Sequence, residues 1–222
     1  MDRFHIEVDA ERTVSALLLS PSQPAACFVF AHGAGAGMTH PFMERVARRL
    51  LERDIATLRY QFPYMEARAK RPDPAAIAQA TVRAAVTAAR KRHPKLKLIA
   101  GGKSFGGRVT SQAQASAPLP GVDGLVFLGF PLHPAGRPSL DRAAHLTQVH
   151  IPMLFLQGTR DKLAEPSLMR TTSENLGARA TLHFVEAADH SFHVAAKSGR
   201  TDAEVINELG DVLVYWLNTI EI

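Results

Sequence analysis

The segment from Leu96 to Val109 constrains the fold of this chain more than any other stretch. It begins with an apolar run typical of a buried strand and ends in a pattern typical of a helix. Between the two lies Gly102-Lys103-Ser104-Phe105-Gly106. A Gly-x-Ser-x-Gly sequence between a strand and a helix predicts a tight, strained turn with the serine hydroxyl at its apex. The flanking glycines leave room where the strand and the helix cross.

Two phosphate-binding motifs resemble parts of this chain but fail on spacing. Gly102-Lys103-Ser104 looks like the end of a Walker A loop, yet the position of that loop's first glycine is occupied by Lys97. Residues 33–37 are rich in glycine, but the third glycine of a dinucleotide-binding fingerprint would fall on Met38. A simpler structural alternative remains, in which Ser104 only caps the helix that follows it.

A nucleophilic serine needs an imidazole to accept its proton and a carboxylate to orient that imidazole. Downstream of Ser104, an apolar strand over residues 152–157 runs into a glycine turn and Asp161. A later strand over residues 180–186 runs into a loop that carries His190. The order serine, acid, histidine along the chain, with each group after a strand, predicts that Asp161 and His190 are the partners of Ser104.

Each partner has rivals in the sequence. Asp123 and Asp141 also follow the serine, but Asp123 precedes a strand and should lie at the opposite end of the sheet. Asp189 is adjacent to His190 and is therefore poorly placed to reach the Nδ1 atom of that ring. His193 is a second candidate base, for which we expect a surface or capping role.

An oxyanion needs two hydrogen-bond donors. The backbone N–H of Phe105 is available at the start of the predicted helix. A second donor is expected from residues 32–37, His-Gly-Ala-Gly-Ala-Gly, which follow an apolar strand over 26–31. We expect the Ala34 N–H to be this donor and His32 to fix the turn by hydrogen bonds. The alternative is a flexible surface loop, which explains the composition but not the position at a strand end.

The alternation of strand and helix patterns predicts a mostly parallel sheet of about eight strands covered by helices on both faces. The first two strands are joined too closely for a helical crossover and should form an antiparallel edge. Strands are expected near residues 3–8, 13–19, 26–31, 55–60, 96–102, 123–129, 152–157 and 180–186, and helices near 41–53, 74–92, 104–116, 165–176 and 201–219.

These motifs together resemble the α/β-hydrolases, and the resemblance covers nearly the whole chain. More narrowly, the chain resembles small hydrolases related to dienelactone hydrolase, in particular those that share their domain with the third subunit of the non-specific-lethal chromatin complex. The resembling segments are residues 31–35, 59–64, 102–108, 129–134, 156–161 and 189–192. The resemblance implies a Ser104–His190–Asp161 triad but no substrate, and its chromatin relatives indicate that the domain can also serve as a scaffold.

Substrate clues lie in the loops after the strands. The segment from Phe130 to Val149, where relatives often carry a lid, is short and interrupted by prolines, which favours an open site and a small or water-soluble ester. Arg59, Lys103 and Phe130 are candidate substrate-binding residues. If basic side chains line the pocket, an anionic substrate is favoured.

Length and composition limit which other classes of protein this chain can belong to. The 222 residues fit one domain (1–222), with 46% hydrophobic residues and no apolar run near the ~20 residues that a membrane span needs. The N-terminus lacks the apolar core of a signal peptide and Cys27 is the sole cysteine, so we expect a cytoplasmic protein without disulfide, metal or cofactor. The net charge of +5 suggests nucleic acid as a candidate partner. Because no aromatic residues are interleaved with the basic ones, a solvated basic helix face explains this charge better.

The sequence thus predicts a serine hydrolase that cleaves a small ester or thioester through an acyl-enzyme. The alternative is a catalytically idle domain of the same fold that acts as a binding module.

Overall fold

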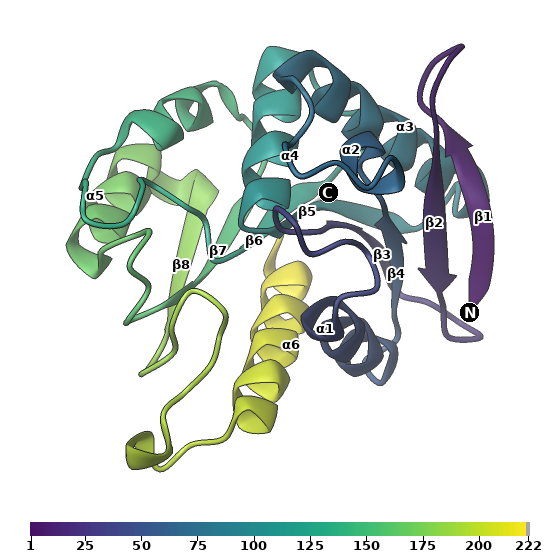
Figure 1. The fold of residues 1–222 in the computed structure, drawn as a ribbon. Coiled ribbons are helices and arrows are strands. Elements are labelled where there is room, and N and C mark those ends of the chain that lie inside the picture. Colours follow the sequence, from purple (N-terminus) through teal and green to yellow (C-terminus); the bar gives the residue numbers. More distant parts are fainter. Residues whose placement is uncertain (221–222) are drawn as a thin grey trace.

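A computed structural model describes residues 1–220 and shows one sheet of eight strands between two layers of helices (Figure 1). The strands are β1 (Asp2–Glu7), β2 (Thr13–Leu19), β3 (Ala26–Ala31), β4 (Ile55–Tyr60), β5 (Lys97–Lys103), β6 (Gly124–Leu128), β7 (Met153–Gly158) and β8 (Ala180–Val185). The α-helices are α1 (Pro41–Leu51), α2 (Pro63–Glu66), α3 (Ala75–Arg92), α4 (Phe105–Ser116), α5 (Pro166–Leu176) and α6 (Asp202–Thr219). Three short 3-10 helices complete the fold: η1 (Asp141–Gln148), η2 (Gly177–Arg179) and η3 (Ala196–Ser198).

The strands follow the order β1-β2-β4-β3-β5-β6-β7-β8 across the sheet. Strands β3 to β8 are parallel to one another, whereas β2 pairs antiparallel with both β1 and β4. The predicted mostly parallel sheet and its antiparallel edge are confirmed. Because the central strands are parallel, the loops after β3, β5, β6 and β7 all emerge at the same edge of the sheet.

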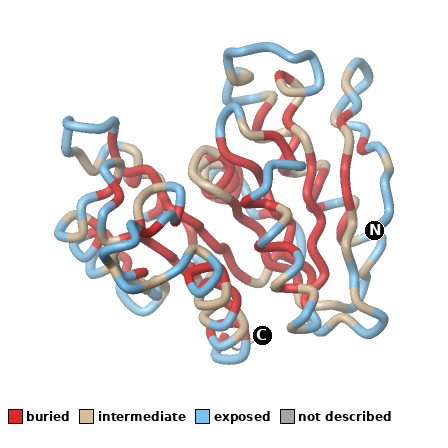
Figure 2. The backbone as a smooth tube through the Cα atoms, turned by 60° about the horizontal axis from the view of Figure 1, so that its bottom comes forward, coloured by how far each residue is buried: buried red, intermediate tan, exposed pale blue. Residues whose placement is uncertain are grey.

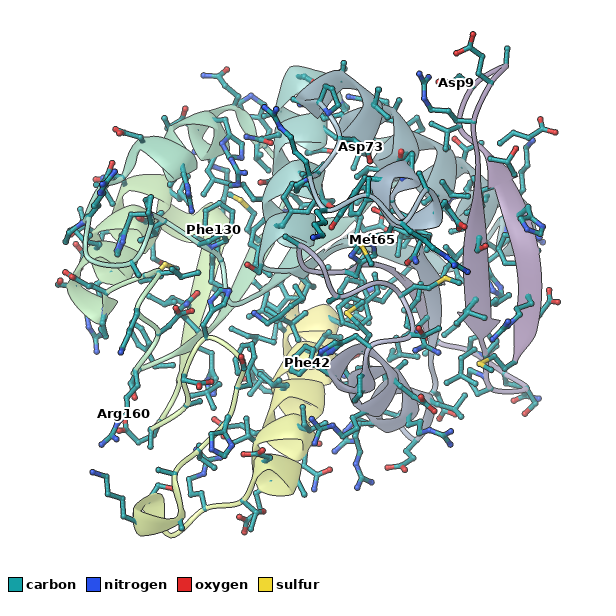
Figure 3. All side chains as sticks on the ribbon, viewed as in Figure 1. Asp9, Phe42, Met65, Asp73, Phe130 and Arg160 are labelled. Carbon is teal, nitrogen blue, oxygen red and sulfur yellow. The ribbon has the colours of Figure 1, made fainter. Side chains whose placement is uncertain are left out.

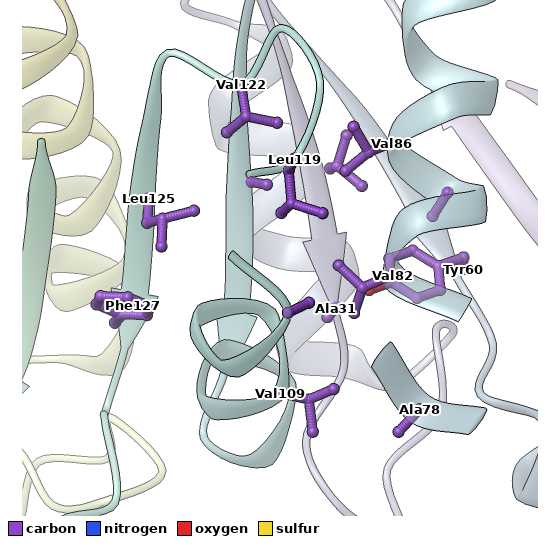
Figure 4. Packing of buried hydrophobic residues seen from close by; sticks show 14 of the residues in the cluster. Ala31, Tyr60, Ala78, Val82, Val86, Val109, Leu119, Val122, Leu125 and Phe127 are labelled. Atoms are coloured by element: carbon purple, nitrogen blue, oxygen red, sulfur yellow. The ribbon is translucent and has the colours of Figure 1, made fainter. Parts of the chain in front are cut away.

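The two faces of the sheet carry separate apolar clusters. Along β3 the side chains alternate, so that Val29 packs on one face and Phe28 on the other. Helices α3 and α4 cover the first face, and α1 and α6 cover the second (Figure 1). Figure 4 shows the first cluster, in which Val82 of α3 and Val109 of α4 face Ala31 of the sheet. The buried strands run through the middle of the molecule, and exposed residues gather in the loops and outer helix surfaces (Figure 2).

Three of the predicted strands have the predicted ends, and the others differ by one residue at one or both ends. Helix α2 and the short 3-10 helices were not predicted, because pieces of three to eight residues carry too few turns for an apolar period to appear. In the segment from Gly129 to Pro152, η1 is the one helical piece, so no separate lid domain covers the site edge.

Several basic side chains that contribute to the net charge hold the scaffold together. The Arg83 guanidinium donates to the carbonyl oxygens of Ala113 and Ala117 at the end of α4. Arg90 donates to three carbonyl oxygens of the α3–β5 connection, including that of Leu96, and to the carbonyl oxygen of Gly121 between α4 and β6. These contacts tie α3 to the end of α4 and to two loops, which gives part of the basic charge a structural purpose.

Within residues 1–220, none of the helices is long and apolar enough to cross a membrane.

Candidate active site

The serine turn has the strained geometry that its sequence predicts. Ser104 lies between the last residue of β5 and the first residue of α4, with φ 49° and ψ −113°. Positive φ is rare for a residue with a side chain, and the surrounding packing must hold it. A Cβ on Gly102 would lie 2.3 Å from the carbonyl oxygen of Ala31, and one on Gly106 would lie 2.6 Å from that of His32. Glycine is therefore required on both sides of Ser104.

Three loops bring Ser104, His190 and Asp161 into a hydrogen-bonded chain. The Nε2 atom of His190 lies 2.8 Å from Ser104 Oγ, and its Nδ1 lies 2.6 Å from Asp161 Oδ2. Asp161 follows β7, and His190 lies in the loop after β8. The Asp161 side chain is fully buried, whereas the His190 ring remains partly exposed. With the Nδ1 proton held by the carboxylate, Nε2 is free to accept the serine proton.

Two further groups hold the Asp161 carboxylate. Gln157 Nε2 donates to Oδ2 at 2.5 Å, and the backbone N–H of Leu163 donates to Oδ1 at 2.8 Å. Gln157 is itself fixed, since its Oε1 accepts from the N–H of Phe130 at 2.9 Å. The sequence analysis missed Gln157. Its signal was a single polar residue near the end of the otherwise apolar strand β7, four residues before Asp161.

The rival residues lie elsewhere or have other partners. Asp123 Oδ2 accepts from the N–H of Leu98, at the start of β5 and the far edge of the sheet. Asp189 Oδ1 accepts from the N–H groups of Ser191 and His193, which closes the turn that presents His190. The exposed His193 ring contacts the carboxylate of Asp202 at 3.0 Å. The remaining rival, Asp141, begins η1.

The loop after β3 lies against the serine turn. A Cβ on Gly33 would be 3.9 Å from Ser104 Cβ, so the backbone of this loop approaches Ser104 closely. Within the described residues, the Ala34 N–H has no hydrogen-bond partner. The Phe105 N–H is the first of α4, where helical N–H groups have no acceptor in the helix. Both groups have the chemistry of oxyanion donors.

His32 fixes this loop. Its Nδ1 contacts the carbonyl oxygen of Gly33 at 2.7 Å, and its Nε2 accepts from the N–H of Phe62 at 3.2 Å. Burial lowers the pKa of His32 to about 4, so the ring is neutral near pH 7 and can make both contacts at once. The structure thus gives His32 the turn-fixing contacts that its position predicted.

A cavity of about 230 Å³ opens over Ser104 and His190. Its walls come from the loop after β3, from the start of α1 and from Ser191. Phe42 and Met43 supply its apolar side, and Figure 3 shows Phe42 between α1 and α6. The volume is below the range of ~300–1,000 Å³ typical of drug-sized ligands. Such a cavity suits a small group beside the reacting carbonyl carbon.

Of the three candidate substrate-binding residues, Lys103 lines this cavity, whereas Arg59 and Phe130 do not. Arg59 is 2% exposed and donates from Nη1 to the carbonyl oxygen of Met38, outside the cavity lining. Phe130 is buried against Phe127 and Phe155 in the core. Lys103 lines the cavity with its carbon chain, but its Nζ atom is buried and has no hydrogen-bond partner within residues 1–220. Side-chain direction, which the sequence does not encode locally, accounts for the positions of Arg59 and Phe130.

Burial lowers the pKa of Lys103 to about 8, and the nearby carboxylates of Asp161 and Asp189 oppose this shift in part. The Nζ atom lies near the edge of the site, since a Cβ on Gly129 would be 3.1 Å from it and 3.5 Å from His190 Nδ1. Lys103 is therefore a buried cation close to Ser104 and His190.

Comparison with known proteins identifies the family and the fold. Residues 24–218 match a family described as an alpha/beta hydrolase domain. The chain is similar in structure to an alpha-beta serine hydrolase homologue from Coxiella burnetii, with 18% identity, a TM-score of 0.76 and 97% of each chain covered.

It is also similar to a serine hydrolase without lid from Xanthomonas campestris, with 21% identity, a TM-score of 0.76 and 97% and 94% of the two chains covered. A dienelactone hydrolase from Anabaena variabilis matches with 19% identity, a TM-score of 0.74 and 96% and 97% coverage. The narrower relation to the chromatin-complex subunit stays a prediction.

Proposed function

Because the chain belongs to the alpha/beta hydrolase domain family, whose fold supports hydrolase activity in general, we propose that it is a serine hydrolase. Its proposed substrate is a small, uncharged ester or thioester. The observation that carries the proposal is the continuous chain from Ser104 Oγ through His190 to Asp161, with contacts of 2.8 and 2.6 Å. A serine whose proton can move to an oriented imidazole is an activated nucleophile.

In the first half of the reaction, Ser104 Oγ attacks the carbonyl carbon of the ester while its proton passes to His190 Nε2. The carbonyl oxygen becomes an oxyanion, which accepts hydrogen bonds from the N–H groups of Ala34 and Phe105. When the tetrahedral intermediate collapses, the bond to the alcohol or thiol breaks and His190 returns the proton to that leaving group. The acyl group remains on Ser104.

In the second half, His190 takes a proton from a water molecule, whose oxygen attacks the acyl carbon. Collapse of this second intermediate breaks the bond to Ser104 Oγ, which regains its proton from His190 and releases the carboxylic acid. The Asp161 carboxylate stabilises the imidazolium that forms twice in each cycle.

The cavity supports a small and uncharged acyl or alcohol group. Among the described residues that line it, none is an arginine or a carboxylate, and the charged atom of Lys103 is buried. An anionic substrate would therefore meet no exposed guanidinium there. Phe42 and Met43 instead offer an apolar wall.

The test is labelling with a fluorophosphonate probe and mapping of the labelled residue by mass spectrometry. We expect an adduct on Ser104 in the wild type and none in Ser104→Ala, which should keep its fold and lose turnover of a panel of short esters and thioesters. Ser167→Ala, which changes an exposed serine on α5, is the control and should label normally. A folded wild-type protein without adduct or turnover would refute the proposal and favour the binding-module alternative.

A further inference from the structure

The loop that supplies the Ala34 donor cannot fix itself by side chains. Residues 33–37 are all glycine or alanine, and Gly35 and Gly37 adopt positive φ angles of 71° and 76°. Its own backbone contributes the bond from the Ala36 N–H to the Gly33 carbonyl at 3.2 Å. Oxyanion stabilisation depends on donors that are already in place before charge develops. The loop therefore needs support from outside.

That support comes from residues 61–64, which follow β4 and include the first two residues of α2. The N–H of Gly35 donates to the Tyr64 hydroxyl at 2.8 Å, and the N–H of Met38 donates to Gln61 Oε1 at 2.8 Å. The third contact is the bond from the Phe62 N–H to His32, directly before the loop. The same short segment thus contacts the chain directly before the loop, within the loop and directly after it.

The segment also touches the second donor residue. The ring of Phe62 packs edge-on against Phe105, with centroids 5.4 Å apart, and the ring of Tyr64 lies 6.5 Å from that of Phe105. One structural element therefore contacts both chain segments that would hold the oxyanion.

Residues 61–64 are anchored independently of the loop. The Gln61 N–H donates to the carbonyl oxygen of Ser15 in β2, and the Tyr64 N–H donates to Asp73 Oδ2 at 3.0 Å. Tyr64 is 3% exposed, and burial raises the pKa of its hydroxyl, which keeps it protonated at neutral pH. A buried group with its own anchors can fix a loop that has none.

We propose that residues 61–64 form an oxyanion-loop brace, in which the Tyr64 hydroxyl and the Gln61 carboxamide are positioning groups that hold the Ala34 N–H toward the reacting carbonyl. This role rests on the proposed serine hydrolase function. Neither side chain contacts the substrate. Each acts through the backbone of the loop.

The test compares Tyr64→Phe with Tyr60→Phe. Both remove one buried tyrosine hydroxyl, but only the Tyr64 hydroxyl, of these two, accepts a hydrogen bond from the loop of residues 33–37. For Tyr64→Phe we expect kcat to fall about tenfold with KM within a factor of two, less than the ~100-fold or greater loss on removing a direct donor. The Ki of a trifluoromethyl ketone, which forms a tetrahedral oxyanion on the serine, should rise by the same factor. Tyr60→Phe should leave kcat and Ki unchanged.

A measurement independent of activity is the exchange rate of the Gly35 amide hydrogen, which should increase in Tyr64→Phe and not in Tyr60→Phe. Gln61→Met tests the second contact in the same way if Tyr64→Phe does not fold. Unchanged kcat and Ki in folded Tyr64→Phe, with an active wild type, would overturn the brace and leave the hydrolase proposal intact. A wild type without turnover or probe labelling would instead overturn both.

Discussion

Replacing Lys103 with methionine is expected to stabilise the protein at neutral pH, although it removes a charge next to the candidate active site. The ammonium is buried without a hydrogen-bond partner within residues 1–220, and burial lowers its pKa from 10.5 to about 8. Each pKa unit corresponds to about 1.4 kcal/mol, so the protonated lysine lowers the free energy of unfolding by about 3 kcal/mol. Methionine has a similar length and no charge to desolvate.

The pH dependence identifies the cause. Below pH 8 the lysine is protonated in the folded and unfolded states, and the buried ammonium lowers the free energy of unfolding by its full amount. Between pH 8 and 10.5 only the unfolded chain keeps the proton, so the cost shrinks as the pH rises and is nearly gone at pH 10.5. The advantage of Lys103→Met over the wild type should shrink in the same interval.

Urea denaturation at pH 7 and pH 10, followed by the fluorescence of Trp216, measures this difference. With a denaturant slope near 3 kcal/mol per molar, we expect the midpoint of Lys103→Met to lie about 1 M above that of the wild type at pH 7. Lys162→Met, an exposed change in the same region, should show no shift. Equal urea midpoints for Lys103→Met and the wild type at pH 7 would refute the claim that the buried ammonium destabilises the fold. If Lys103→Met were still more stable than the wild type by the same amount at pH 10, the stabilisation would come from packing and not from the removed charge.

Two further changes test the catalytic geometry. Asp161→Asn should lower kcat for a short ester by about 10³–10⁴-fold, because a carboxamide can donate to His190 Nδ1 and favours the tautomer whose Nε2 cannot accept the serine proton; steady-state kinetics with near-normal kcat would place the acid elsewhere. Gly106→Ala should lower the free energy of unfolding by about 2–3 kcal/mol, because the new Cβ would lie 2.6 Å from the main-chain oxygen of His32, and an unchanged melting temperature would contradict this contact.

The sequence predicts most of this fold because its local patterns and its long-range order agree. Strand β3 is an unbroken apolar run followed by His32 and Gly33, and its limits are recovered to the residue. The arrangement of Ser104, Asp161 and His190 also follows from sequence order, since parallel strands place the loops that follow them at one edge.

The sequence does not predict in which direction a long side chain points or what surrounds its charged end. Lys103 and Arg59 occupy positions next to the site, yet one ammonium is buried behind His190 and one guanidinium binds a main-chain carbonyl. Tyr64 and Gln61 were part of a resembling segment without an assigned role, because their partners are backbone groups about 25 residues away. Contacts of this kind depend on tertiary packing and leave no periodic pattern.

The strained serine turn couples the chemistry to the integrity of the whole sheet. Ser104 keeps its positive φ because β5 and α4 cross against the backbone of β3, with main-chain atoms of Ala31 and His32 in contact on both sides. If β3 separates from β5, these backbone contacts no longer hold the Ser104 hydroxyl at the apex of the turn, and the serine should lose its reactivity. Fluorophosphonate reactivity would then count folded molecules directly, and its loss in denaturant should coincide with loss of the core instead of preceding it.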